Sequence, residues 1–462
     1  MTSFTIIEPG IGEWRSATID EDGFPIDLKS HLDASLSPLD TIFRARVTRV
    51  DNTLDMAFLD LGDGLSGAMN LRRAKLLVKG RADTISDCVC EGDMLTVQVI
   101  SEPGFLEAKA LPVTPRPRLL GRYCVVEAGG SRLNFSKDLS AKKQKALAPL
   151  LADIAASAAI IVRSHAGEVP AEAVVNEAVM LVKGLTKSAD KPGLLFSHSP
   201  LEQALLAAPA DESDILIEGG SILAEAKAIA NRLWPDLKER LQLYKGSSSA
   251  FEELGVNETI DEALADRIEL PSGGWISITP TPALTAIDVN MGSALKGRNA
   301  GEAKLVTNME AAMAVAFHLR FQDIGGLVVV DFIDMSSKGH AKELMDTVTK
   351  AFREDSVPVQ HTGLSQFGLM EINRKRRGLS LRDRMLRQSR QTPRPEAMAL
   401  DLLRKARRAT DSAEPGTLVL VMPMAVQNWF EQHPNLMSTL KESAGRPIET
   451  ETGETPSAWI RS

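Results

Sequence analysis

The sequence predicts a multidomain α/β protein. Its 462 residues are enough for several domains. Residues 39–100 alternate short β-rich runs with Gly- and Asp-containing turns, which is typical of a small barrel or sandwich. Residues 284–354 alternate two apolar β-forming runs with two helical segments, which is the βαβ pattern of a sheet whose strands are buried on both faces.

The other elements follow from periodicity and turn signals. The Pro-rich stretch LPVTPRPR at 111–118 predicts a linker. We expect strands near RYCVVEA and AAIIVRS, and helices near SAKKQKALAPLLADI and PAEAVVNEAVMLVKGL. Helices are also expected around PLEQALL and GGSILAEAKAIANRLWPDL, and IELPSGGWISITP passes through a Pro-Gly turn into a strand. The last predicted strand is TLVLVMPM, with a helix on each side.

Composition describes an ordinary globular chain, with 44% apolar residues and a net charge of −8. The sequence shows neither a basic and apolar secretory signal nor a run of about 18 uncharged apolar residues, so we expect a cytoplasmic protein without a membrane span. The three cysteines, Cys88, Cys90 and Cys124, lack zinc-knuckle spacing. We expect them to be packing residues in a reducing compartment.

One segment departs from the acidic average. Between residues 374 and 408 the chain carries thirteen Lys or Arg against three Asp or Glu. Such a run is either the solvated surface of a helix pair or a contact for a polyanion, and composition alone leaves both open.

Polar side chains end two of the expected strands. In TAIDVN, Asp288 and Asn290 are two residues apart and share a face, and in VVVDFIDM, Asp331 shares a face with Val329 while Asp334 points the other way. Ligands of open α/β sheets gather at the carboxyl ends of strands, where Asp288 and Asp331 would meet if their strands are neighbours. Paired carboxylates without Cys or His suit Mg²⁺ or Mn²⁺. The alternative is that each Asp only caps a turn or helix.

Four segments in this order, TAIDVN, TNMEAA, HLRFQDIGGLVVVDFIDM and FGLMEINRKR, resemble the catalytic region of the ribonuclease E/G family. The resemblance continues upstream through RLQLYKG and IELPSGGWI, and more weakly to IFRARVTRV and DMAFLDLG. It therefore covers most of residues 1–385.

The resemblance implies a chain of modules. An RNase H-like fold is split in sequence by an inserted S1-like OB domain and a 5′-sensor region, and a DNase I-like α/β catalytic domain and a small C-terminal α/β domain follow. The implied boundaries are 1–38 and 196–265 for the two parts of the RNase H-like domain, 39–112 for the S1-like domain, 113–195 for the 5′-sensor, 266–385 for the catalytic domain and 386–462 for a basic linker with the small domain.

The resemblance also implies an Mg²⁺-dependent endoribonuclease that cuts single-stranded RNA in rRNA maturation or mRNA turnover. Asp288 and Asp331 would hold the Mg²⁺, with Mn²⁺ as an alternative, and Asn290 would orient the attacking water or the scissile phosphate. The ion would polarise a phosphoryl oxygen and activate water for in-line attack, which leaves a 5′-phosphate and a 3′-hydroxyl.

Further RNA contacts are implied outside the catalytic pair. Phe58 stands where the family stacks a base, a contact worth about 1–3 kcal/mol. The second aromatic of the family is replaced by Ala68. Arg163 and Ser164 resemble the pocket that reads a 5′-monophosphate, with Arg163 as a bidentate donor. The full set of expected RNA contacts is Phe58, Lys109, Arg163, Ser164 and Arg374, the last of which begins the basic run.

The family pattern breaks after RKRRGLSL, where a CPxC zinc link usually follows. No Cys lies beyond 124, so we expect no zinc, and a homodimer would have to form without a zinc link. We also expect no long scaffold tail of the kind through which relatives assemble a degradosome. These departures keep a second interpretation open, a catalytically weakened RNA-binding paralogue. A third is a DNA-directed nuclease, although OB domains that bind unstructured RNA argue against it.

Overall fold

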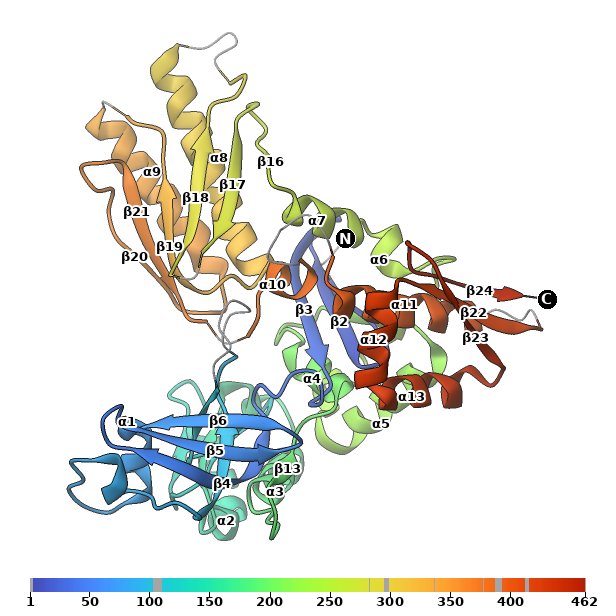
Figure 1. Cartoon of the computed structure of the whole chain (residues 1–462). Coiled ribbons are helices and arrows are strands. Elements are labelled where there is room, and N and C mark those ends of the chain that lie inside the picture. Colours follow the sequence, from blue (N-terminus) through green and yellow to red (C-terminus); the bar gives the residue numbers. More distant parts are fainter. Residues whose placement is uncertain are drawn as a thin grey trace.

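The protein is described by a computed structural model, shown as three bodies in Figure 1. The described residues are 3–102, 110–281, 283–294, 299–335, 337–376, 378–386, 393–411 and 415–461. A body formed by the two ends of the chain contacts both an inserted β-rich body and a body built on a six-stranded sheet. The expected mixed α/β multidomain class with several sheets is confirmed.

The first sheet joins segments that lie far apart in the sequence. Its order is β15-β14-β1-β2-β3, with β1 parallel to β14 and antiparallel to β2. Its strands are β1 (Phe4–Glu8), β2 (Glu13–Ile19), β3 (Pro25–Leu32), β14 (Asp214–Ile217) and β15 (Leu241–Leu243). Its helices are α4 (Pro200–Ala207), α5 (Gly220–Leu233), α6 (Ala250–Glu253) and α7 (Val256–Leu264). Residues 33–199 are therefore an insertion into one folded unit.

The insertion begins with a small barrel. Six strands run in the order β13-β4-β5-β6-β8-β7, and β4 also pairs with β7, which closes the sheet. Buried Val47, Leu59, Met69 and Val97 fill its interior. The elements are β4 (Ile42–Asp51), β5 (Met56–Gly62), β6 (Leu65–Asn70), α1 (Leu71–Ala74), β7 (Met94–Val99), β8 (Leu111–Thr114) and β13 (Gly193–Phe196).

The prediction of a linker at residues 111–118 is wrong. Leu111–Thr114 forms β8, in which Leu111 pairs with Gly67 and Pro112 with Ala68. Pro112 has no N–H to donate, but its carbonyl accepts from the N–H of Ile100, so the proline sits in the sheet without losing a required bond.

The second part of the insertion is a four-stranded sheet in the order β11-β12-β10-β9, with α2 and α3 packed in one core with it. That core continues into the first sheet through fully buried Trp234, whose indole N–H donates to Glu177 of α3 at 2.7 Å. The elements are β9 (Arg118–Leu120), β10 (Cys124–Glu127), β11 (Leu133–Phe135), α2 (Ala141–Ala155), β12 (Ala159–Val162) and α3 (Ala171–Leu185).

The third body is the sheet β16-β17-β18-β19-β21-β20, in which only β18 and β19 are parallel. The crossover between them is α8, and α9 packs beside α8 on the same face, as Figure 1 shows. The elements are β16 (Ile268–Glu269), β17 (Trp275–Pro280), β18 (Thr285–Asn290), α8 (Ala300–Phe321), β19 (Gly326–Asp331), α9 (Lys338–Ala351), β20 (Val359–His361) and β21 (Leu369–Arg374).

The expectation that this sheet is buried on both faces is wrong. Ile276, Ile287, Val328 and Val330 pack against α8 and α9, whereas alternate residues of the same strands are partly or fully exposed. Both helices lie on one face, so the other face is open to solvent. We call it the open face.

The C-terminal segment folds back onto the first sheet. A small sheet in the order β23-β22-β24 packs with three helices around buried Leu402, Leu403 and Leu420. The elements are α10 (Leu381–Met385), α11 (Pro395–Thr410), β22 (Thr417–Met422), α12 (Met424–Gln432), α13 (Pro434–Ala444), β23 (Ile448–Thr452) and β24 (Ser457–Arg461).

Buried ion pairs hold α11 against the first sheet. Arg404 pairs with Glu13, Arg408 pairs with Glu8, and Glu8 also pairs with Arg15. Burial alone would raise the pKa of Glu13, but Arg404 and Arg15 outweigh it and hold this pKa below its usual value. Ion pairs that are largely buried thus join the two ends of the chain.

Replacing Arg404 with Met should lower the free energy of unfolding by about 3–5 kcal/mol, because Glu13 is left as a buried charge without its main partner. The matched control is Arg461→Met, which breaks exposed pairs with Glu449 and Glu451 and should cost under about 1 kcal/mol. Urea unfolding followed by circular dichroism measures both. Equal losses in the two variants would contradict the assignment of Arg404 to a buried joint.

Because His31 of β3 is buried, we predict that the folded protein becomes less stable as the pH falls. Burial, with help from Lys29 and Arg384, lowers the pKa of His31 to about 3, and Ser16 Oγ lies 2.8 Å from its Nε2. The unfolded chain binds this proton near pH 6.5 and the folded chain does not, so stability falls as pH decreases from 6.5 towards 3. When the pH falls from 7 to 5, the free energy of unfolding measured with urea should decrease by about 1–2 kcal/mol less in His31→Gln than in wild type. Identical losses would mean that His31 does not titrate differently on folding.

Candidate active site

The two aspartates of the expected strand ends lie side by side. In the parallel pair of β18 and β19, Asp288 is the direct partner of Asp331. Paired residues on adjacent strands project to the same face, and both side chains are exposed on the open face. Asn290 shares this face, and its Nδ2 donates to Asp288 Oδ2 at 2.7 Å. The two strands are neighbours, which is the condition under which Asp288 and Asp331 meet.

The open face explains how a strand rich in buried Val can carry carboxylates. Val328 and Val330 are fully buried on the helix side, and the intervening positions, including Asp331, reach solvent. The carboxylates therefore avoid the cost of desolvation. Like charges on neighbouring strands repel each other, and a cation between them would offset this repulsion.

Glycines hold the carboxyl end of β18. The turn before β17 passes so close to β18 that a Cβ on Gly274 would lie 2.8 Å from the main-chain oxygen of Asn290. Gly292 has a φ of +46°, and a Cβ there would lie 2.2 Å from the oxygen of Gly273. The N–H of Ser293 donates to that oxygen at 2.9 Å. The PSGG segment is therefore needed for a close approach beside Asn290.

A buried amide holds the chain where it leaves β19. Asn308 of α8 is fully buried, its Nδ2 donates to the oxygen of Ile333 at 2.8 Å, and its Oδ1 accepts from the N–H of Ile333 at 3.0 Å. In the sequence, the segment TNMEAA supports the family resemblance, but it predicts no role for Asn308. The available signal was a polar residue on the helical face of buried Ala311, Ala312 and Val315.

Phe58 lies on β5 of the barrel and is half-buried. The Arg49 guanidinium sits 4.3 Å from the centre of its ring, and Ala68 is its neighbour on β6. One side of the ring therefore already has a cation–π partner. Lys109 lies outside the described residues.

Arg163 and Ser164 are both exposed directly after β12. The N–H of Arg163 donates to Tyr123 O at 2.7 Å, and its Nη1 donates to Gly121 O at 2.7 Å. The main chain beside them is held by Glu177, which accepts from the N–H groups of Arg122, Tyr123 and Cys124. The structure thus places Arg163 and Ser164 on a rigid support.

Asp236 is a second support that sequence reasoning missed. It accepts from Arg122 Nε at 3.0 Å and Nη2 at 2.6 Å, bonds Tyr123 OH, and lies 3.0 Å from His165 Nε2. Burial raises its pKa, but His165 and Arg122 outweigh burial and hold the pKa of Asp236 well below its usual value. His165 is therefore engaged by a carboxylate.

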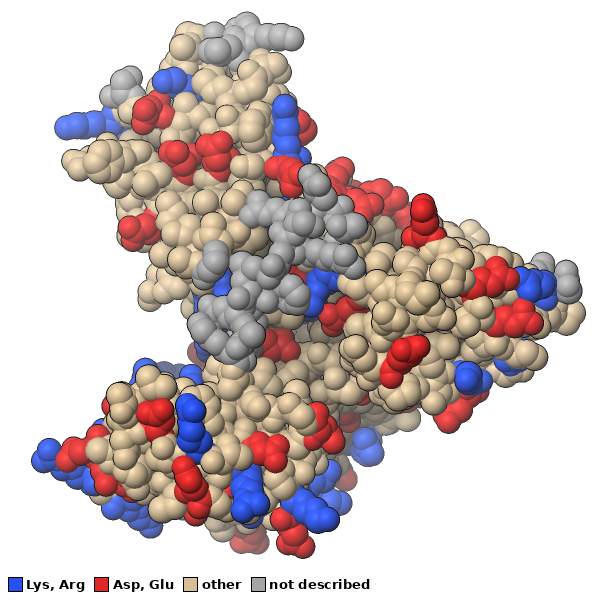
Figure 2. All heavy atoms as spheres, in the orientation of Figure 1, with Lys and Arg blue, Asp and Glu red and all other residues tan. Residues whose placement is uncertain are grey.

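The structure places Arg374, which we expected to contact RNA, in a buried network of ion pairs. The side chain is 3% exposed, its Nε donates to Asp355 at 2.7 Å and its Nη1 donates to Asp323 at 2.7 Å. Two further arginines of the basic run, Arg382 and Arg404, are also buried. These three arginines of the run are structural, and the described acidic and basic side chains are interspersed over the face shown in Figure 2.

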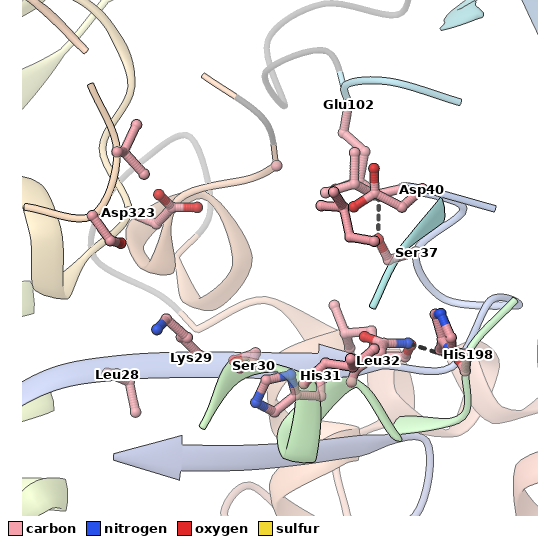
Figure 3. Close-up of a pocket in the computed structure, with 18 of the residues that line it drawn as sticks. Leu28, Lys29, Ser30, His31, Leu32, Ser37, Asp40, Glu102, His198 and Asp323 are labelled. Carbon is pink, nitrogen blue, oxygen red and sulfur yellow. Dashed lines mark hydrogen bonds between the residues drawn. The ribbon is translucent and has the colours of Figure 1, made fainter. Parts of the chain in front are cut away.

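A cavity of about 460 Å³ lies where the three bodies meet. Figure 3 shows Ser37 and Glu102 joined across one wall, where Ser37 Oγ donates to Glu102 at 2.6 Å. Both Arg163 and Arg374 line this cavity. Other labelled lining residues are Leu28, Lys29, Ser30, His31, Leu32, Asp40, His198 and Asp323.

The carboxylate pair fits a hard divalent cation. Mg²⁺ commonly takes one or two carboxylates and completes its shell with water and substrate oxygens. Within the described ranges, no three His, Cys, Asp or Glu side chains gather closely enough to hold a metal ion. Asp288 and Asp331 would therefore supply carboxylate ligands to an ion that keeps positions for other ligands.

The fold and site define a multidomain α/β protein in which a small barrel accompanies a sheet that exposes paired carboxylates. Comparison with known proteins then places it. A profile of the Ribonuclease E/G family matches residues 118–377, and the chain belongs to this family.

The chain is 32% identical to ribonuclease E of Haemophilus influenzae over 360 residues, covering 74% of this chain and 38% of that protein. It is 31% identical to ribonuclease E of Escherichia coli over 361 residues, covering 74% and 34%. It is 28% identical to ribonuclease G of Escherichia coli over 397 residues, covering 81% and 80%. The matched region thus spans little more than a third of the two ribonuclease E proteins. In the part of the chain that is described, no helix has the length and apolar character needed to cross a membrane.

The Asn308 clamp predicts a defined loss of stability. Asn308→Leu keeps a similar volume but leaves the part-buried N–H and C=O of Ile333 without their partner, so the free energy of unfolding should fall by about 1–3 kcal/mol. Asn435→Leu, at an exposed position of α13, should change it by under about 0.5 kcal/mol. Hydrogen exchange should show faster exchange at Ile333 in the first variant only. Unchanged exchange there would contradict the clamp.

Proposed function

We propose that this protein is an endoribonuclease that cleaves single-stranded RNA with the help of a divalent cation, Mg²⁺ or Mn²⁺, held by Asp288 and Asp331. The observation that carries this proposal is the direct pairing of the two aspartates on the open face. Family membership supports it, since the relatives are named as ribonucleases.

Each group at the site has a separate task in this proposal. When bound, the cation would supply Lewis-acid stabilisation to the phosphoryl group under attack. Asn290 holds Asp288 through its amide and would orient the attacking water or the scissile phosphate. Hydrolysis would leave a 5′-phosphate and a 3′-hydroxyl, in the processing of rRNA and the turnover of mRNA in the cytoplasm.

The other bodies would supply RNA contacts. The small barrel would act as an S1-like module, with Phe58 as a stacking residue. Exposed Arg163 and Ser164, on their rigid support, would read a 5′-monophosphate. Residues 266–385 would be the DNase I-like catalytic domain, and the sheet shared by both ends of the chain would belong to the split RNase H-like domain.

The first test is cleavage of a 3′-labelled AU-rich single strand with Mg²⁺ or with EDTA. Asp331→Asn should lower kcat about 10²- to 10³-fold, since it removes one of two charges that would hold the cation. Asp334→Asn is the matched control, because Asp334 is also exposed but follows β19 and has no such partner on β18. Full activity of wild type in EDTA would refute metal dependence. RNA binding without any cleavage by wild type would favour the weakened RNA-binding paralogue.

The second test compares substrates with a 5′-monophosphate and a 5′-hydroxyl. Arg163→Ala should abolish the preference for the monophosphate, a loss of about tenfold or more, because a charge-assisted contact is removed. Arg118→Ala, at an exposed position of β9, which β10 separates from β12 in the same sheet, should leave the ratio unchanged. If Arg163→Ala keeps the preference for the 5′-monophosphate substrate, the 5′ end of the RNA binds elsewhere.

A further inference from the structure

The open face continues past the aspartates to the edge of the sheet. Across β17 and β18, Ser277 is the partner of Asp288, and Trp275 is the partner of Asn290. Across β16 and β17, Glu269 is the partner of Trp275. Ile276, between Ser277 and Trp275, is buried on the helix side. Trp275 therefore shares the face of the carboxylates.

Arg267, directly before β16, completes this group. Its guanidinium lies 5.0 Å from the centre of the Trp275 ring, and it is joined to Glu269 by contacts of 2.5 Å from Nε and 3.2 Å from Nη2. The Arg267 side chain is 52% exposed, and Trp275 is half-buried beneath it. We call these three residues the edge cluster.

The edge cluster contributes little to folding by itself. Exposed ion pairs are weak because water screens them, and exposed cation–π contacts are also modest. The cluster nevertheless sets a flat cationic group over Trp275 of β17, the strand next to that of Asp288, and the backbones of β16 and β18 are about two strand spacings, roughly 9.5 Å, apart. Neighbouring nucleotides of one RNA strand can bridge such a distance.

We propose that Arg267 and Trp275 form a stacking subsite for the nucleobase next to the scissile phosphate. This inference rests on the proposed function of Asp288 and Asp331. RNA-binding proteins stack unpaired bases on aromatic rings and on guanidinium planes, and this cluster offers both.

A base fits this subsite better than a phosphate does. Glu269 occupies the hydrogen-bonding edge of the Arg267 guanidinium and neutralises its charge. The nearby carboxylates of Asp288 and Asp331 further disfavour an anion unless a cation is present. The plane of the guanidinium remains available, and a purine, which has the larger ring system, should stack there better than a pyrimidine. The subsite would thus give the enzyme a preference for a base beside the cleaved bond.

The experiment is a coupling measurement on the full chain with a single-stranded RNA that has one cleavage site. Bases flanking this site are removed one at a time as abasic nucleotides, and kcat/KM is measured for wild type and Trp275→Ala. In wild type, removal of one particular base should lower kcat/KM about 5- to 100-fold. In Trp275→Ala the same removal should have less than about a twofold further effect.

Three further variants separate the causes. Trp275→Phe keeps a ring and should restore much of the coupling, which excludes a folding defect as the explanation. Arg267→Lys keeps the charge but loses the plane, so it should lose most of the coupling. Arg461→Lys, an exposed arginine paired with glutamates in a different sheet, should behave as wild type.

Two results would overturn the subsite. One is an abasic effect that is the same in wild type and in Trp275→Ala at every position. The other is a coupling that persists in Arg267→Lys and Trp275→Ala together. Failure of wild type to cut any substrate would instead refute the proposed function. In that case the subsite is tested by binding. The affinities of wild type and Trp275→Ala for each abasic strand are measured by fluorescence anisotropy, and removal of the stacked base should weaken binding to wild type only.

Discussion

The parallel pairing of β18 and β19 is the constraint on which the candidate site depends. It brings Asp288 and Asp331, which lie on either side of the long helix α8 in the sequence, onto neighbouring strands in direct register. A shift of one residue would turn one carboxylate into the apolar core, where desolvation would strongly disfavour it. The hydrophobic alternation of both strands therefore specifies the register and the site together.

The surroundings of the two strands restrict how far this pair can move. A glycine turn approaches the end of β18, and the buried amide of Asn308 holds the chain after β19. Both devices act on the main chain at the two strand ends, so they position the carboxylates without occupying the open face. This leaves that face free for a cation and an extended RNA strand, with the edge cluster at its border.

Several arginines of this protein form buried ion pairs and add little to its cationic surface. Arg374 is bound to two aspartates at the base of the six-stranded sheet, and Arg404 joins α11 to the first sheet. The guanidinium group suits such buried ion pairs, because it stays charged and its several N–H groups can donate to more than one acceptor. The net charge of the run 374–408 therefore overstates the cationic surface available to RNA.

The sequence by itself determined the mixed α/β class and the barrel-like island, and it singled out Asp288, Asn290 and Asp331 as candidates for a site, because strand alternation and turn residues are local signals. Only the tertiary structure decided that one face of the sheet stays open, that Arg374 is buried, and that Glu269 and Trp275 border the site. These properties depend on which side of the sheet the helices pack and on contacts between residues far apart in the chain. Local periodicity does not contain that information, since an exposed and a buried arginine are identical in sequence.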